Sequence, residues 1–293
     1  MINITDIKER LKKNPEPKEV TEMRENILSA FSNLEFIEEG HKYYIHNEDG
    51  TTTEMTSVSH ICHMFEPYVN WDAKAEGVAL KEGVDIEVIK RRWKENNLQS
   101  TSNGTLTHLF AEAYMWFFMG KPEMMPKNIY KMQYEDGFLI PYGEKQKAIV
   151  SFYEDLYKVD NFFPVMPETQ IYIKKDDNQY GINYNISGTF DALFAFKRNN
   201  QFYLSIFDWK TNKSLYSEYN QKFNNTLLPP FNKPDFINQP KSLYTLQLNL
   251  YQLGLEQLNY NIADRKLIWL KEDGNYKKIS VPDITNLIKK ALQ

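Results

Sequence analysis

The sequence predicts a mixed α/β fold: a central mixed sheet flanked by helices, with a helical elaboration at the N-terminus. Two runs rich in β-branched and aromatic residues lie on either side of Asn199-Asn200 and predict a β-hairpin within residues 182–213. Apolar residues recur at helical spacing before and after this hairpin, at about 144–159 and 243–258. A sheet with helices packed on it is the arrangement that such an alternation favours.

The other elements follow from local patterns. Pro15 and Pro17 interrupt a helical lead-in, and the turn-like residues 47–50 separate two short strands of a small hairpin. We expect one domain, with an N-terminal elaboration at 1–100 packed on a core at 101–293. The expected elements are a lead-in at 1–32, a hairpin from 34–45 and 51–58, helices at 84–96 and 104–118, a linker at 120–143, a strand at 167–173, a long loop at 214–241 and a strand at 266–270.

Composition limits the class of protein. With 42% hydrophobic residues the chain can bury a core, and no run of 18 uncharged apolar residues predicts a membrane span. The N-terminus lacks the apolar segment of a signal peptide, and the single cysteine, Cys62, can form neither an internal disulfide nor a four-cysteine iron–sulfur cluster. We therefore expect a cytoplasmic protein without a membrane partner. Because the net charge is −4, any contact with DNA must be local.

A tight turn at Asn199-Asn200 sets the register of the central hairpin. Asparagine tolerates the positive φ that two-residue hairpin turns require. Such a turn pairs Arg198 with Gln201 and, further along, Asp191 with Asp208. Opposed side chains have Cβ atoms about 4.5–5.5 Å apart, so the two carboxylates repel each other unless a cation lies between them.

Strand alternation adds a lysine to this pair. Lys210 lies on the same face as Asp208, whereas Trp209 points to the opposite face. Two carboxylates and a lysine predict a site for a hard cation, Mg²⁺ or Mn²⁺, of the kind that hydrolyses phosphodiesters. The alternative is a solvated sheet face with surface charges, and the apolar residues that precede these charges argue against it.

Four short motifs resemble those of one nuclease superfamily. Gly188-Thr189-Phe190-Asp191 and Asp208-Trp209-Lys210 resemble the D…(D/E)xK signature of the PD-(D/E)xK nucleases. Gln247 and Tyr251 resemble the Q-x-x-x-Y motif of the RecB-like branch, and Gly104-Thr105 with His108 resembles its Gly-Thr-x-x-His motif. The motifs stand in the family's order within residues 104–251, which makes them more specific than D-x-K alone. The likeness is greatest to phage-type exonucleases.

This resemblance implies a PD-(D/E)xK core of order αβββαβ and a metal-dependent exonuclease that acts at DNA ends in recombination, repair or replication. Asp191, Asp208 and Lys210 are then the catalytic residues. The metal is expected on Asp191, Asp208, His108 and the backbone carbonyl of Trp209, with Lys210 positioning the attacking water.

Further residues are assigned accessory roles. Glu168 occupies the place of an accessory acidic residue in some relatives, the alternative being an exposed glutamate at the start of a strand. Glu112 shares a helix face with His108 and either orients it or pairs with a surface lysine. The resemblance places Gln247 and Tyr251 near the active site as DNA-contacting or organising residues, and Lys213 is expected to bind DNA.

The expected partner is DNA, as a linear duplex or a frayed end, together with a recombination protein of the single-strand-annealing class. The location implied is the cytoplasm of a bacterial host if a phage encodes the chain. Aromatics and lysines in 214–241 suit contact with single strands, or else pin the loop on the core.

Two other functions stay open. The first is a DNA-binding or recombination scaffold that kept the fold without activity, although opposed carboxylates would repel phosphate. The second is a nuclease that acts on RNA or as an endonuclease, because a metal site attacks the phosphodiester without reading sugar or base.

Overall fold

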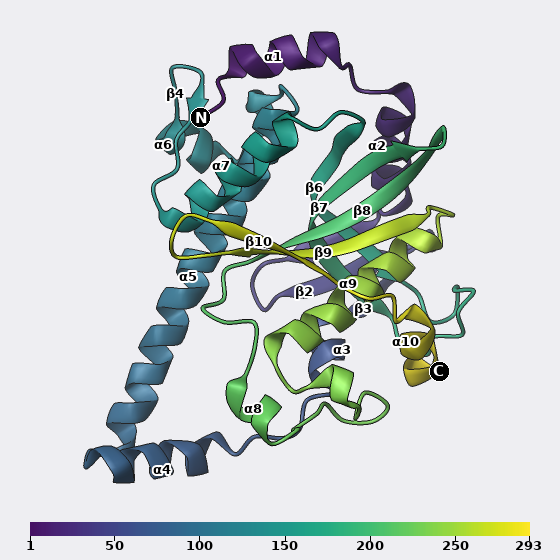
Figure 1. Ribbon diagram of the computed structural model, residues 1–293. Coiled ribbons are helices and arrows are strands. Elements are labelled where there is room, and N and C mark those ends of the chain that lie inside the picture. The colour runs from purple at the N-terminus through teal and green to yellow at the C-terminus, as the bar shows by residue number, and fades with distance from the viewer.

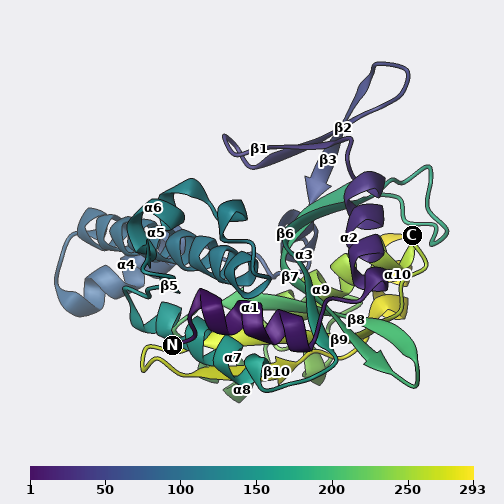
Figure 2. The same cartoon turned by 90° about the horizontal axis from the view of Figure 1, so that it is seen from above.

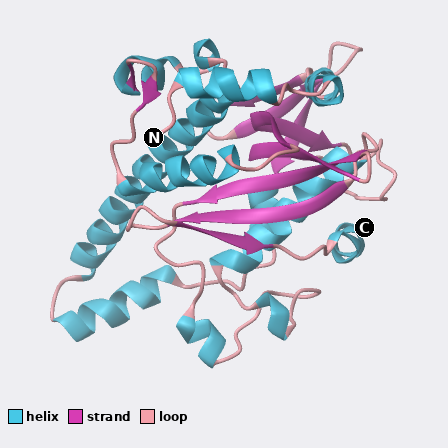
Figure 3. Cartoon of the chain, turned by 45° about the horizontal axis from the view of Figure 1, so that its top comes forward, coloured by secondary structure: helices cyan, strands magenta, loops and turns pink.

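Helices cover both faces of a central mixed sheet in the computed structural model, which describes residues 1–293 (Figures 1 and 3). The elements are α1 Ile4–Lys13, α2 Lys18–Ala30, β1 Leu34–Ile37, β2 Lys42–His46, β3 Thr52–Ser57, α3 Val58–His63, α4 Trp71–Glu82, α5 Ile86–Phe118, η1 Pro122–Met124, α6 Lys127–Gln133, β4 Tyr134–Glu135, β5 Phe138–Leu139, α7 Glu144–Tyr157, β6 Phe162–Ile173, β7 Ile186–Arg198, β8 Gln201–Lys210, α8 Glu218–Lys222, η2 Pro234–Phe236, α9 Pro240–Glu256, β9 Ile262–Leu270, β10 Tyr276–Ser280 and α10 Thr285–Leu292.

The long strand β7 organises the sheet. It pairs antiparallel with β6 over residues 186–196, so β6 occupies one of its two edges. The other edge pairs with β3 at Ile186 and Ser187 and with β8 from Ala192 onward. Residues 188–191 of β7 therefore have no strand partner on that edge. Beyond β8 the sheet continues with β9, parallel to β8, and β10, antiparallel to β9.

The central hairpin has the predicted register. Asn199 and Asn200 both adopt positive φ, at 51° and 65°, and the ladder runs from Arg198↔Gln201 to Ala192↔Phe207. One further step sets Asp191 opposite Asp208. The register predicted from the Asn-Asn turn is confirmed over this ladder, which ends one position before Asp191 and Asp208.

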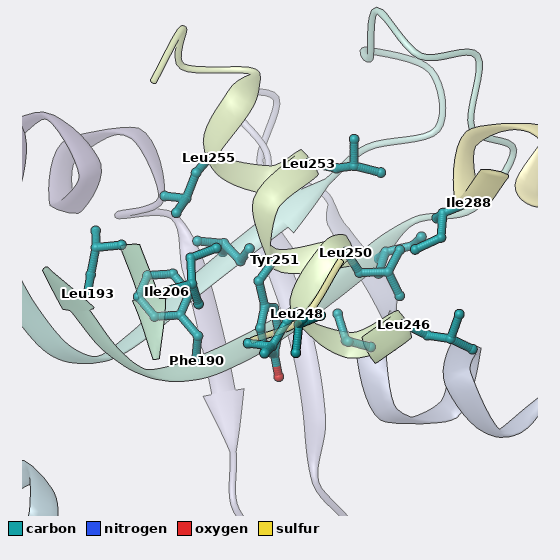
Figure 4. Close-up of a cluster of buried hydrophobic side chains, with 14 of the residues drawn as sticks. Phe190, Leu193, Ile206, Leu246, Leu248, Leu250, Tyr251, Leu253, Leu255 and Ile288 are labelled. Atoms are coloured by element: carbon teal, nitrogen blue, oxygen red, sulfur yellow. The ribbon is translucent and has the colours of Figure 1, made fainter. Parts of the chain in front are cut away.

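Two apolar layers hold the helices on the sheet. Leu204 and Ile206 of β8 pack with α2, α3, α9 and α10, whereas Phe207 and Trp209 pack with α5 and α7 on the opposite face. Figure 4 shows the α9 side, where Tyr251 lies beside Phe190 of β7. Because β8 alternates between these layers, Asp208 and Lys210 are on the α9 face, as predicted.

The small N-terminal hairpin is a three-stranded meander. The prediction joined residues 34–45 into one strand, but Gly40 and His41 take positive φ, 81° and 53°, and turn the chain between β1 and β2. β2 then pairs with β3, which joins the edge of β7. Seen from above, the meander projects from the rest of the molecule (Figure 2).

The expectation of two helices at 84–96 and 104–118 is wrong, because α5 runs unbroken for 33 residues, from Ile86 through Gly104 to Phe118. A single glycine costs a helix only about 1 kcal/mol, so Gly104 does not by itself end α5. This helix crosses the expected boundary between residues 100 and 101. It also carries α4 away from the sheet (Figure 1). None of the helices combines the length and apolar character needed to cross a lipid bilayer.

Candidate catalytic and metal site

Three carboxylates lie side by side on three adjacent strands. In the β6–β7 ladder Pro167 pairs with Ala192 and Thr169 with Phe190, so Glu168 lies across from Asp191 at a position that the ladder skips. On the other side of β7, Asp208 of β8 comes directly after the last ladder pair, Ala192↔Phe207, and so lies next to Asp191. Adjacent strands are about 4.8 Å apart, so the three carboxylates of this row lie close to one another.

Glu168 occupies an unusual backbone position. It was expected at a strand start, but β6 begins six residues earlier and Glu168 lies in its interior, half-buried, with a φ of 41°. A left-handed conformation for a residue other than glycine costs of order 1–3 kcal/mol and persists where the surroundings impose it. This backbone distortion turns the carboxylate toward Asp191 and away from the regular alternation of the strand.

Asp191 is held by donors from two elements. Its Oδ2 accepts a hydrogen bond from the backbone N–H of Trp209 at 2.6 Å, and its Oδ1 accepts one from Nδ1 of His108 at 3.1 Å. Burial alone would raise the pKa of Asp191, but His108, Lys210 and the Trp209 N–H outweigh it and lower the pKa. Asp191 is therefore an ionised carboxylate.

His108 reaches this carboxylate from α5. Burial would lower its pKa, yet the charge and hydrogen bond of Asp191 raise it above the ordinary value. A carboxylate can only accept, so Nδ1 donates the proton and Nε2 is the nitrogen left to bind a cation. This is the arrangement that orients metal-binding histidines.

Asp208 and Lys210 form a buried ion pair, with 2.5 Å between Oδ2 and Nζ. Burial, reinforced by the charge of Asp191, raises the pKa of Asp208 to about 6 despite the attraction of Lys210. Burial lowers the pKa of Lys210, but Asp208, Tyr244 and Asp191 together raise it. Lys210 thus stays a cation, and it cannot act as a base near neutral pH.

Helix α9 encloses the ammonium group of Lys210. The ring of Tyr244 lies 3.8 Å from Nζ, and Oε1 of Gln247 accepts a 3.5 Å hydrogen bond from it. Gln247 in turn donates to the hydroxyl of Tyr251 at 2.8 Å. The sequence motifs do not include Tyr244. Its place three residues before Gln247, on the same helix face, is the pattern that could have indicated it.

A group of potential metal ligands is formed by His108, Glu168 and Asp191, whose ligand atoms all lie within 4.8 Å of one another. Asp208, also predicted to be a ligand, is not part of this group, and its Oδ2 lies 2.5 Å from Nζ of Lys210. Trp209 is predicted to bind the cation through its backbone carbonyl. Its N–H donates to Asp191, and within a strand the N–H and C=O of one residue point to the same side, so the carbonyl also faces the side of Asp191.

Glu112 has neither of its predicted contacts. It forms no hydrogen bond with His108 and no ion pair with a lysine. It lines a cavity of about 400 Å³ together with Glu168, and its charge contributes to raising the pKa of that residue, after burial and Asp191. Glu112 therefore adds to the excess of negative charge around Glu168.

Two further cavities open on the site from different sides. One of about 560 Å³ is lined by His108 and Lys210, by Lys145 of α7 and by Lys213 beyond the end of β8. The other, of about 350 Å³, lies between the meander and β7 and is lined by Glu168, Gln247 and Tyr251. No sequence motif points to Lys145, because α7 carries none of the recognised motifs.

Comparison with models of protein families and with curated protein sequences gives no match for this chain.

Proposed function

We propose that the protein is a Mg²⁺- or Mn²⁺-dependent nuclease that hydrolyses DNA phosphodiester bonds, with the core of a PD-(D/E)xK enzyme. The observation that carries the proposal is the row of three carboxylates, with His108 on one side and a buried lysine on the other. The element order α7, β6, β7, β8, α9, β9 agrees with the αβββαβ core implied by the motifs. Action at DNA ends, as an exonuclease, rests on the resemblance to phage-type RecB-like enzymes.

A divalent cation fits the donor set. Three carboxylates face one lysine and one histidine, and the pKa of Glu168 is raised well above its ordinary value by burial and by its acidic neighbours. A buried excess of negative charge is unfavourable until a cation neutralises it. Carboxylate oxygens suit Mg²⁺ and Mn²⁺, and His108 adds a nitrogen that Mn²⁺ accepts. When bound, the cation would polarise the scissile phosphate and promote ionisation of the attacking water.

The remaining steps fall to side chains of the chain itself. Asp191 and Glu168 hold the cation, and His108 is kept in position by its hydrogen bond to Asp191. Lys210 places a fixed positive charge beside Asp208, where it can orient a water molecule and stabilise the charge that develops on the phosphate. Tyr244 and Gln247 restrict the ammonium group to this place.

The lysine-lined cavity is the approach for the DNA backbone. Lys145, Lys210 and Lys213 line it together with the polar side chains of Gln99 and Asn103 of α5. Glu272 also lines it and is ion-paired with Lys145. A local group of lysines next to a metal site binds phosphates even though the whole chain carries a net charge of −4.

The test compares end-labelled linear duplex, covalently closed circles and RNA, each with Mg²⁺ or Mn²⁺ and with EDTA. We expect linear DNA to be degraded from its ends, closed circles to be spared, and cleavage to stop in EDTA. Asp191→Asn should abolish cleavage, whereas the matched control Asp177→Asn, in an exposed loop, should leave it unchanged. DNA binding without cleavage would favour a scaffold, nicked circles an endonuclease and degraded RNA a ribonuclease. Full activity in excess EDTA would refute the metal mechanism.

A further inference from the structure

The free edge of β7 opens into the cavity of about 350 Å³ beside the meander. Residues 188–191 have no strand partner on this edge, because β3 ends before them and β8 pairs only after them. Four residues of extended chain span roughly 13 Å. Gly188 allows α3 and α9 to come close at this point, since a Cβ there would meet Tyr251 at 2.9 Å and Val58 at 3.0 Å.

Aromatic side chains of the meander form the outer wall of the cavity. Phe36 of β1 lies with its ring centroid 4.9 Å from His41 and 4.7 Å from Tyr43. Tyr43 is buried and its hydroxyl is 3.3 Å from Oγ1 of Thr189, which attaches this wall to the free edge of β7. Phe36 is half-buried and His41 is exposed, so their rings remain accessible to a ligand.

The chemistry of this cavity differs from that of the lysine-lined one. Its lining contains no lysine or arginine, and its only carboxylate is Glu168 of the acidic row. A phosphate would be repelled here. The amides of Gln170 and Gln247 and the hydroxyl of Tyr251 instead offer donors and acceptors to a neutral, planar, polar group. A nucleobase has this chemistry, because its face stacks on aromatic rings and its edge forms hydrogen bonds.

We propose that this cavity binds one unpaired nucleobase of the DNA, next to the phosphate that is cleaved. The inference rests on the proposed nuclease function, since it takes the acidic row as the place of the scissile phosphate. The strand then enters along the lysine-lined cavity, passes the acidic row and places its neighbouring base against Phe36 and His41. Gln247 contacts both sides, because it lines the base cavity and hydrogen-bonds Lys210.

The test measures binding by fluorescence anisotropy with Ca²⁺ as the cation, so that cleavage does not interfere. The probe is a duplex with three unpaired nucleotides at one end, each in turn replaced by an abasic residue, on the 5′ and on the 3′ strand. For the wild type we expect one position at which loss of the base weakens binding by about 5- to 100-fold, the range of base–aromatic stacking.

Phe36→Leu keeps an apolar side chain in β1 but removes the ring. We expect this variant to bind the natural end as weakly as the wild type binds the abasic one, and to lose the discrimination between them. Tyr44→Leu is the matched control, because Tyr44 neighbours Tyr43 in β2 but does not line the cavity. It should discriminate as the wild type does, which also shows that the meander tolerates such a change.

The two proposals fail in different ways. If the wild type binds natural and abasic ends equally, or Phe36→Leu retains full discrimination, the base site is refuted even if the protein cleaves DNA. If the discrimination is found but Mg²⁺ and Mn²⁺ support no cleavage, the base site stands and the nuclease function is wrong.

Discussion

Replacing Asp208 by asparagine should stabilise the metal-free protein while abolishing cleavage. The pKa of Asp208 rises from 3.8 to about 6, because burial and the charge of Asp191 disfavour its ionised form. Between about pH 4 and pH 6 the folded protein therefore holds this proton more firmly than the unfolded chain does. The contribution of Asp208 to stability falls as the pH rises through this window, and the carboxylate is destabilising above it.

The size of the effect follows from the two pKa values. Their difference corresponds to about 3 kcal/mol at neutral pH. Asparagine has the shape of the protonated acid without its charge, so Asp208→Asn should recover up to about 3 kcal/mol of the free energy of unfolding. Loss of the ion pair with Lys210 does not reverse the sign, because that attraction already acts on the pKa of Asp208.

Thermal unfolding followed by circular dichroism in EDTA checks this expectation. At neutral pH the variant should unfold at a higher temperature, by about 2–4 °C for each kcal/mol in a chain of this size. The advantage should shrink as the pH is lowered toward 4. Added Mn²⁺ should raise the melting temperature of the wild type more than that of the variant, because the variant lacks one of the three negative charges that attract the cation and a ligand stabilises in proportion to its binding. Cleavage should fall by orders of magnitude, with DNA binding unchanged or tighter.

Two results would refute the reasoning. A metal-free variant less stable than the wild type at neutral pH would mean that Asp208 serves mainly as the partner of Lys210. An unchanged gap between the two proteins across the pH range would mean that Asp208 titrates normally. Asp177→Asn is the control, because this exposed carboxylate should alter neither stability nor its pH dependence.

Three further results are expected. Ca²⁺ should support DNA binding but little cleavage, because its looser coordination positions water poorly, and rapid cleavage in Ca²⁺ alone would contradict this. Gly188→Ala should lower the free energy of unfolding, measured by urea denaturation, by about 1–3 kcal/mol, because the new Cβ would lie 2.9 Å from Tyr251; an unaltered midpoint would show that the helices can yield. Gly104→Ala should instead raise it by up to about 1 kcal/mol, since this Cβ meets only Thr211 at 3.5 Å inside a helix; a loss of stability would indicate that α5 needs a flexible point there.

Those parts of the site that depend on local rules could be predicted from the sequence. The Asn199-Asn200 turn fixes the register of β7 and β8, and the period of two then places Asp208 and Lys210 on one face. His108 was found through its motif, and it does contact Asp191. These predictions needed only a turn type, strand alternation and a short motif.

Features set by tertiary packing could not be predicted in this way. Nothing in the residues around Glu168 signals a positive φ inside a strand, because the neighbouring strands impose it. Gly104 suggested the start of a helix, whereas it lies inside α5. Its packing against Thr211 depends on a loop that is distant in the sequence. The pairing of Asp208 with Lys210 rather than with the ligand group depends on Tyr244 and Gln247 of α9, which direct the ammonium group.

The unbroken course of α5 has a mechanical consequence. About 33 Å of helix separates Ile86, next to the α4 turn, from His108. α4 packs on α5 through the buried side chains of Ala75, Ala79 and Ile89, so the two helices move together. A displacement of α4 therefore reaches the hydrogen bond between His108 and Asp191 only as far as α5 stays straight. Gly104, one turn before His108, is the point where α5 bends most easily.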